Sequence, residues 1–237
     1  MSFDLNDKLL ATTALPDLPQ ARCFGAAECT IQGDLLHLGG GDSPFGAAKS
    51  FTDCAILKNN AEQWQEGVVP NMRQARCGHR AVTLFNDSIL VAGGYAGCDT
   101  FLSSVELLDS QLDRWTQLPD MTTPRSGAAS VLGPGGAVYI AGGTMNTTDG
   151  MRSLERYDPR EGKWHTLADM NQCRSFVAGC QSIHNGFYVM GGMHQGRVAD
   201  SVEFYDFRAN RWRFAVGSAE QTCFELNKVT AYMALKL

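Results

Sequence analysis

Short apolar runs separated by turn-forming residues extend along most of the chain. Four of these runs end in a pair of glycines, and they read LHLGG, LVAGG, YIAGG and YVMGG. Apolar segments of this length, bounded by Gly, Asn, Asp and Pro, are typical of β-strands, and helical periodicity is scarce. Glycine has no Cβ, so a strand can stop and turn sharply at such a pair. The pattern predicts an all-β fold of short strands.

The runs belong to a repeat of about 50 residues, a period typical of repeat folds. Two markers keep this period independently: the first glycine of each pair, and the single tryptophans Trp64, Trp115, Trp164 and Trp212. Each unit holds four short apolar segments with turns between them, which predicts a four-stranded antiparallel blade of a β-propeller. We place the repeats in a single domain, 1–237, at 20–69, 70–120, 121–169 and 170–213.

The third and fourth units carry the segments SLERYD (153–158) and SVEFYD (201–206), each followed by a tryptophan. Together, the double glycine, this segment and the tryptophan resemble the kelch repeat over residues 20–213. The first copy departs from the pattern, because Ala55 stands where the other copies have glutamate. The resemblance implies a β-propeller of kelch repeats with four recognisable four-stranded blades.

Kelch propellers usually have more than four blades, and closing the ring removes the exposed strand edges that invite aggregation. We therefore expect the terminal stretches 1–19 and 214–237 to supply strands for a fifth blade closed by both ends. The alternative is an open or truncated fragment of a larger propeller.

Composition and charge narrow the class of partner. The chain is 44% hydrophobic with a formal net charge of −5, so neither nucleic acid nor a membrane is expected as a partner. No secretion signal or long apolar span is visible, so we expect a cytoplasmic location, with the nucleus as an alternative, and reduced cysteines. The eight cysteines and five histidines lack metal-ligand spacing, so we expect no cofactor, no metal and no catalysis.

Two groups of signature residues have a structural interpretation. The tryptophans should pack between blades, because large aromatic side chains dominate burial at such interfaces. The glutamates Glu106, Glu155 and Glu203 fall in otherwise apolar third strands. A buried carboxylate must be hydrogen-bonded or paired, so each glutamate should have a partner.

An arginine precedes the first strand of every copy, on the face that also carries the loops after the glycine pairs. Guanidinium groups bind carboxylate or phosphate oxygens with a planar fork, so this rim suits an acidic or phosphorylated partner segment. The alternative is a repeated structural contact, such as a salt bridge to a neighbouring blade. The candidate partner-binding residues are Arg22, Arg76, Arg125, Arg174, Tyr95, Met145, Asn146, His194 and Gln195.

The kelch resemblance implies a non-catalytic protein-interaction module, because kelch substrate receptors bind short partner segments on this face. It therefore suggests a substrate adaptor whose partners include acidic segments of other proteins and, as one alternative, a ubiquitin-ligase complex. No BTB, BACK or F-box segment fits into the N-terminal stretch, so we expect that role to belong to a longer parent or a separate subunit. Two further alternatives, known among kelch-like propellers, are an enzyme with an unseen metal site and an actin-associated structural protein.

Overall fold

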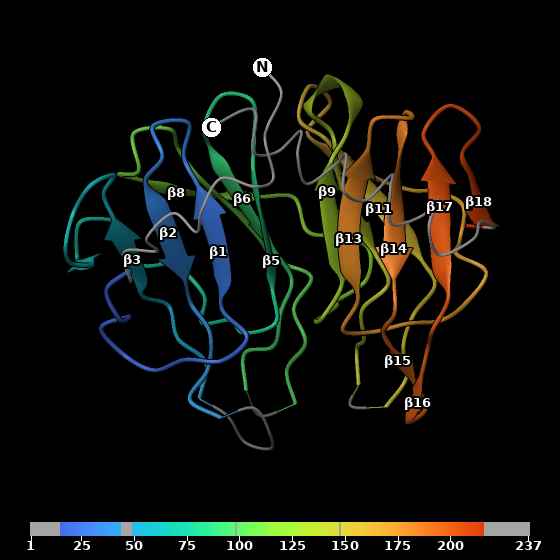
Figure 1. Cartoon of the computed structure of the whole chain (residues 1–237), viewed down its shortest axis with the longest axis horizontal. Helices are drawn as coiled ribbons and strands as arrows, with labels where there is room; N and C mark the ends of the chain where they lie inside the picture. The colour runs from blue at the N-terminus through green and yellow to red at the C-terminus, as the bar shows by residue number, and fades with distance from the viewer. Residues whose placement is uncertain (1–14, 44–48, 98, 147, 216–237) are drawn as a thin grey trace, which may run out of the picture.

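The computed structural model describes residues 15–43, 49–97, 99–146 and 148–215. Within these ranges the chain forms β-strands and one short 3₁₀ turn, Pro134–Gly136. The strands make four four-stranded antiparallel sheets and a separate two-stranded hairpin (Figure 1). This arrangement confirms the predicted all-β fold with four blades.

Blades 1 and 2 are formed from consecutive strands along the chain. Blade 1 consists of β1 (Ala26–Cys29), β2 (Leu35–Leu38), β3 (Cys54–Leu57) and β4 (Gln65–Glu66). Blade 2 consists of β5 (Arg80–Thr83), β6 (Ile89–Ala92), β7 (Val105–Leu108) and β8 (Trp115–Leu118).

Blade 3 follows the same order, whereas blade 4 carries a hairpin inserted between its second and third strands. Blade 3 consists of β9 (Ala129–Leu132), β10 (Val138–Ala141), β11 (Leu154–Asp158) and β12 (Lys163–Thr166). Blade 4 consists of β13 (Ala178–Ser182), β14 (Gly186–Met190), β17 (Val202–Asp206) and β18 (Arg211–Phe214). The inserted hairpin is formed by β15 (Met193–His194) and β16 (Arg197–Val198).

The first strands of successive blades lie side by side in the middle of the molecule: β1 contacts β5, β5 contacts β9, and β9 contacts β13 (Figure 1). Arg80 on β5 ties three of these blades together. Its guanidinium donates to the carbonyl of Ala128 and, at 3.3 Å, to the carbonyl of Val177. Burial lowers the pKa of this arginine.

The antiparallel strands give the molecule two distinct faces. The glycine-pair face carries the residues before each first strand and the loops after each glycine pair, including the β15–β16 hairpin at the bottom of Figure 1. The turn face, at the top, carries the turns that join first to second strands and third to fourth strands. Gly142 shows why the pair is glycine, because its φ is +66° and an added Cβ would lie 2.7 Å from the carbonyl oxygen of Arg174 in the next blade.

The hydrophobic core consists of three layers, each between two successive blades. Trp115 of blade 2 packs in one layer with Leu36, Leu38 and Ile56 of blade 1. A second layer joins blades 2 and 3, and a third joins blades 3 and 4 and contains Trp212. The packing of these tryptophans between blades is confirmed. Their indole N–H groups also donate to carbonyls of the preceding linker, Trp115 to Pro70 and Trp212 to Ala168, each at 2.8 Å.

The outer two first strands differ from the inner two. The inner strands β5 and β9 each have two buried and two half-buried residues, whereas β1 and β13 are mostly half-buried or exposed. The predicted fifth blade falls on 1–19 and 214–237, and residues 1–14 and 216–237 lie outside the described part of the chain. Among the described residues, no helix has the length and apolar character needed to cross a membrane.

Candidate interaction surface

The repeat arginines of blades 2 to 4 are buried, and Arg125 shows how such a group is accommodated. Its side chain is only 1% exposed. Nη1 donates to the carbonyls of Gly142 at 2.7 Å and Ser153 at 3.3 Å. Nη2 donates to Ser153 Oγ at 3.1 Å and to Glu155 Oε1 at 2.6 Å. The cation is thus bound entirely by groups of its own blade.

The equivalent arginines make the same contacts. Arg76 pairs with Glu106 at 2.7 Å and Arg174 pairs with Glu203 at 2.9 Å, with all four side chains 0% exposed. Burial lowers the pKa of Arg76, and the hydrogen bond and charge of Glu106 oppose that shift. Removing one partner of such a pair would leave an uncompensated buried charge. The pairs therefore hold each blade together.

The three glutamates have further donors besides the arginine. Glu155 accepts the backbone N–H groups of Thr122, at 2.7 Å, and Thr123, at 3.2 Å. Equivalent backbone donors bind Glu106 and Glu203. The expectation that each buried glutamate has a partner is confirmed.

Arg22 in the first copy uses a different acid, because Ala55 replaces the glutamate. It forms an ion pair with Asp53 and donates to the carbonyl of Gly39 at 3.3 Å. Its guanidinium also lies 5.0 Å from the ring centroid of Phe51. Burial raises the pKa of Asp53, but Arg22 outweighs this and holds it below its ordinary value.

These contacts correct the predicted rim of open guanidinium groups. The side chains of Arg76, Arg125 and Arg174 are enclosed, and a partner on the glycine-pair face cannot reach them. The repeated structural contact that the sequence left open is present, although the salt bridge lies within each blade. The neighbouring blade contacts the backbone instead, since Gly94 N–H donates to the carbonyl of Arg125 at 2.8 Å and Gly143 N–H to that of Arg174 at 2.9 Å.

Tyr95 and Met145 lie on the glycine-pair face, as their positions after the glycine pairs require. Tyr95 is half-buried with its ring edge-on to Phe101 at 5.2 Å, and its hydroxyl accepts the N–H of Asp99 at 3.1 Å. The side chain of Met145 is 55% exposed. Of these two predicted residues, Met145 offers the larger open apolar surface.

Asn146, His194 and Gln195 make loop contacts. The Asn146 carboxamide oxygen accepts the N–H groups of Thr148 at 2.9 Å and Asp149 at 2.6 Å, so it shapes its own loop. His194 Nδ1 accepts the N–H of Gly150 at 3.2 Å, which joins the loops of blades 3 and 4. The backbone N–H of Gln195 donates to the carbonyl of Thr148 at 3.0 Å.

Two phenylalanines that the sequence reasoning missed, Phe24 and Phe176, also lie on this face. Each stands two residues after a repeat arginine, where the other copies have Gly78 and Gly127. All four residues have positive φ, at +54°, +52°, +61° and +64° in the order named. The Phe24 and Phe176 side chains are 46% and 50% exposed, and their ring centroids lie 6.2 Å apart. The sequence does carry a signal for them, because phenylalanine stands at a repeat position that is glycine in the two other copies.

Exposed apolar side chains continue from Phe176 into the hairpin. Met193 forms a backbone bridge with Ser175, which precedes Phe176, and pairs with Val198 across the hairpin. Met193 is 41% exposed and Val198 is 79% exposed. We call Phe24, Phe176, Met193 and Val198 the apolar patch.

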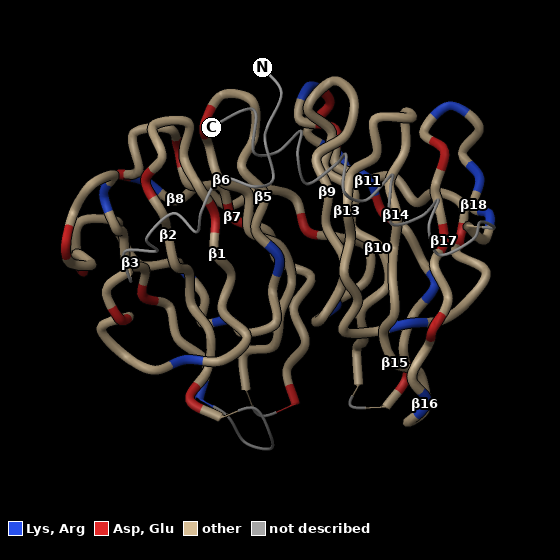
Figure 2. The backbone as a smooth tube through the Cα atoms, viewed as in Figure 1, with Lys and Arg blue, Asp and Glu red and all other residues tan. Residues whose placement is uncertain are grey.

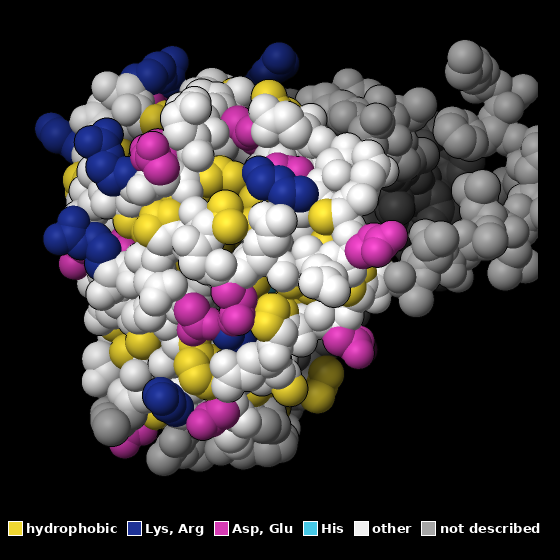
Figure 3. Space-filling view, turned by 90° about the vertical axis from the view of Figure 1, so that its left-hand side faces the viewer, with side chains coloured by type: hydrophobic (Ala, Val, Ile, Leu, Met, Phe, Trp, Pro, Cys, Tyr) yellow, Lys and Arg dark blue, Asp and Glu magenta, His cyan; other side chains and the backbone are white. Residues whose placement is uncertain are grey.

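The turn face also has exposed apolar side chains, at Ile31, Phe85 and Ile183, but no ring contact between them like that of Phe24 and Phe176 is found among the described residues. On the side that carries β3 and β8, basic and acidic side chains are interspersed with hydrophobic ones (Figure 3). Among the described residues, no group of three or more His, Cys, Asp and Glu side chains could hold a metal ion. The apolar patch is therefore the stronger candidate for a partner contact.

Comparison with known proteins identifies the class of this propeller. Residues 25–223 match the family model described as the KLHDC2/KLHL20/DRC7 Kelch-repeats domain. The chain belongs to the kelch-repeat family, whose domains are typically non-catalytic and bind other proteins. It is similar to human Kelch-like protein 34, with 32% identity over 126 residues. That alignment covers 49% of this chain and 18% of the relative.

Proposed function

We propose that this domain is a non-catalytic protein-interaction module that binds a partner segment on the glycine-pair face, with the apolar patch as its anchor. The observation that carries the proposal is the pair of exposed phenylalanines in left-handed backbone, where two other blades have glycine. Aromatic side chains are enriched at the centres of protein interfaces relative to the rest of the surface.

The conformation of the phenylalanines favours a binding role over a packing role. A residue with a Cβ in the left-handed region costs roughly 1–2 kcal/mol relative to right-handed backbone. Burial of the ring could offset that cost, yet both rings remain about half exposed. Strain retained without a matching gain in packing is concentrated at functional sites. A partner that covers the rings would supply the missing burial.

The chemistry of the patch also defines the partner segment. The repeat arginines are engaged by Glu106, Glu155 and Glu203, so they do not support capture of an acidic or phosphorylated segment on this face. A segment that presents an apolar or aromatic side chain to Phe24 and Phe176 fits the exposed surface. The substrate-adaptor role, a ubiquitin-ligase partner and a cytoplasmic location remain predictions from the sequence.

The test replaces both phenylalanines by the residue of the other blades. Immobilised wild-type protein and a Phe24→Gly, Phe176→Gly double variant capture partners from a lysate, and the captured proteins are quantified by mass spectrometry. Glycine accepts the positive φ without strain, so the fold should persist, as checked by circular dichroism. A matched control is Phe85→Gly, which removes a phenylalanine that is 71% exposed in the β5–β6 turn of the opposite face.

We expect the double variant to lose a set of specific partners that the wild type and the Phe85→Gly control both retain. Loss of those partners from the wild-type domain on addition of a purified candidate segment would identify the ligand. Full retention of every partner by the folded double variant would refute the proposed anchor.

A further inference from the structure

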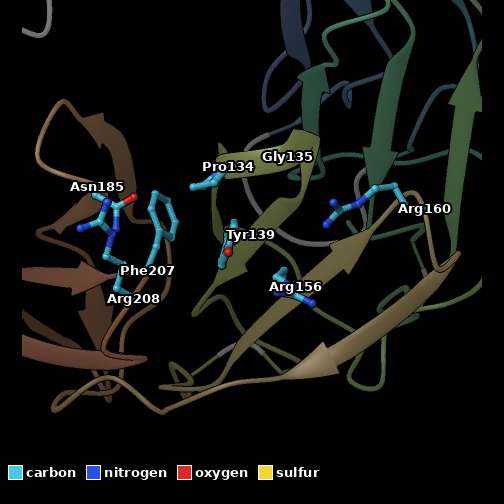
Figure 4. A pocket seen from close by; sticks show the side chains of 8 residues that line it. All are labelled: Pro134, Gly135, Tyr139, Arg156, Arg160, Asn185, Phe207 and Arg208. Atoms are coloured by element: carbon cyan, nitrogen blue, oxygen red, sulfur yellow. The ribbon is translucent and has the colours of Figure 1, made fainter.

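A pocket opens on the turn face between blades 3 and 4, away from the apolar patch. Its volume is about 440 Å³, which lies within the range of small-molecule sites. Blade 3 contributes one side of it and blade 4 contributes the other (Figure 4). The lining residues are Pro134, Gly135, Tyr139, Arg156, Arg160, Asn185, Phe207 and Arg208.

Arg156 departs from the repeat. It occupies the position two residues before the aspartate that ends the third strand, where blades 2 and 4 have Leu107 and Phe204. Blade 1 has Ile56 at the same register. The other blades have apolar residues at this position, so the structural role of the repeat does not explain a cation here.

The three arginines of the pocket are only partly neutralised. Arg160 donates to both carboxylate oxygens of Asp158, at 3.1 and 2.9 Å, yet its side chain is 72% exposed. These bonds lower the pKa of Asp158 to about 2, so it stays ionised. Arg156 lies 3.6 Å from Asp158 and 3.9 Å from Glu161, in looser pairs.

Of the three pocket arginines, Arg208 has the fewest ion-pair contacts. It is exposed in the β17–β18 turn, where the backbone carries a cluster of basic positions (Figure 2). Its guanidinium has no carboxylate within 4.0 Å among the residues that the structure describes. Three guanidinium groups thus lie near three carboxylates, Asp158, Glu161 and Asp206, and backbone hydrogen bonds together with the charge of Arg208, which has no close ion pair with a described residue, lower the pKa of Asp206.

The other lining residues form an apolar wall and include hydrogen-bond donors without an acceptor. Phe207 packs on Tyr139 with ring centroids 4.7 Å apart, beside Pro134. Asn185 Nδ2 and Arg156 Nε are buried N–H donors that have no acceptor among the described residues. Unsatisfied donors of this kind favour an acceptor-rich ligand.

We propose that this turn-face pocket binds a phosphate monoester. A phosphate carries up to two negative charges and three acceptor oxygens, which match several guanidinium forks better than a carboxylate with two oxygens does. The wall of Phe207 and Pro134 accommodates an apolar or aromatic carrier of the phosphate. The carrier is either a small phosphorylated molecule or a phosphorylated side chain of a protein, and the recognition chemistry is common to both.

The probe is phenyl phosphate, added to the full chain in phosphate-free buffer at low salt and followed by ¹H–¹⁵N nuclear magnetic resonance. We expect saturable shifts confined to residues of blades 3 and 4 on the turn face. Arg208→Gln and, separately, Arg156→Leu should each weaken binding about tenfold or more, because each removes a charge-assisted donor. Leucine already occupies the equivalent position in blade 2, so the second variant should fold.

The matched control is Arg197→Gln, which removes an exposed arginine from the glycine-pair face. It should change the affinity less than about twofold, because a charge on the opposite face makes no direct hydrogen bond to the bound phosphate. Equal weakening by the control would show general attraction to exposed arginines and overturn the proposal. Absence of saturation up to about 10 mM, or benzoate binding as tightly as phenyl phosphate, would also overturn it.

A second series identifies the carrier. A phosphotyrosine peptide that binds more tightly than phenyl phosphate, and loses affinity in Arg156→Leu, supports a protein source. Tighter binding of phenyl phosphate, with the same loss in the variant, supports a small molecule. Because the phenylalanines on the other face are unchanged in all these proteins, the outcome is independent of the proposed protein-interaction role.

Discussion

Arginine has opposite roles in two regions of this propeller. The repeat arginines of blades 2 to 4, such as Arg125, lie before the first strands with 1% or less of the side chain exposed, and each is paired with a glutamate of its own blade. The turn-face arginines, Arg156, Arg160 and Arg208, lie at the open edge between blades 3 and 4. The first group keeps the period of the sequence, whereas Arg156 departs from it.

The contrast between these two groups of arginines shows which contacts can be predicted from a repeated sequence. A residue present in every blade faces the same neighbours in every blade, so its partners are provided by the repeat itself. Arg125 and Glu155 are an instance, since Arg76 and Glu106 reproduce their contacts. A residue that most blades lack faces neighbours that the repeat does not supply. Arg156, found in one blade, and the phenylalanines Phe24 and Phe176, found at one position in two of the four blades, belong to this second kind. They line the surfaces that we propose to bind ligands.

The largest predicted effect comes from a repeat arginine. Arg174→Met leaves Glu203 buried without its cation, at 0% exposure, and should lower the free energy of unfolding by about 3–5 kcal/mol. Equilibrium urea unfolding measures this change. Arg211→Met, at an exposed position of β18 in the same blade, serves as the control and should stay within about 0.5 kcal/mol. A comparable loss in both variants would remove the distinction between the two regions.

A smaller effect comes from a buried base without a partner. His79 is 1% exposed, and neither ring nitrogen has a hydrogen-bond partner among the described residues. Burial lowers its pKa to about 3, with Arg76 and Arg80 adding to the shift. The folded state therefore binds fewer protons than the unfolded state, in which histidine titrates near pH ~6.5. The stability that this group contributes is present above that pH and is lost as the pH falls towards 3.

Between pH 7 and pH 5, this one histidine should lower the free energy of unfolding by about 2 kcal/mol. His79→Val, which places the residue of the equivalent Val177 there, should remove that part of the pH dependence in urea unfolding. The exposed His165 is the matched control, and His165→Val should keep the wild-type slope. An unchanged slope in His79→Val would contradict the assignment.

The smallest effect on stability is expected at the apolar patch. Phe176→Gly relieves a left-handed backbone but gives up the contact with Phe24, so the free energy of unfolding should change by less than about 1 kcal/mol. Thermal and urea unfolding of the single variant measure this. A loss of several kcal/mol would assign Phe176 to the core of the fold instead of to a binding surface.

Much of the fold could be predicted from the sequence because the repeat gives the same information four times. The glycine pairs mark the ends of the second strands, and the tryptophans mark the outer strands that pack against the preceding blade. Glu155 could be identified as a buried carboxylate in need of a partner, since it interrupts an apolar strand. These features could be predicted because each depends on the type of residue at a repeated position, and the sequence gives residue types directly.

The candidate sites could be predicted much less well. Arg125 was assigned to the correct face, but only the strand register shows that its guanidinium reaches Glu155 and not solvent. The pocket requires Arg156 and Phe207 from two blades that are adjacent only in the fold. Phe24 and Phe176 lie far apart in the sequence. Their rings come into contact only because the fold brings the starts of the first strands of blades 1 and 4 close together.

The repeat arginines of blades 2 to 4 stabilise their blades, whereas Arg156, which departs from the repeat, lines the pocket between blades 3 and 4. Urea unfolding of wild type, Arg125→Met and Arg156→Leu, which lie in the same blade, tests this difference. We expect the free energy of unfolding to fall by about 3–5 kcal/mol in Arg125→Met and to change by no more than about 1 kcal/mol in Arg156→Leu. Equal losses in the two variants, or a larger loss for Arg156→Leu, would contradict it.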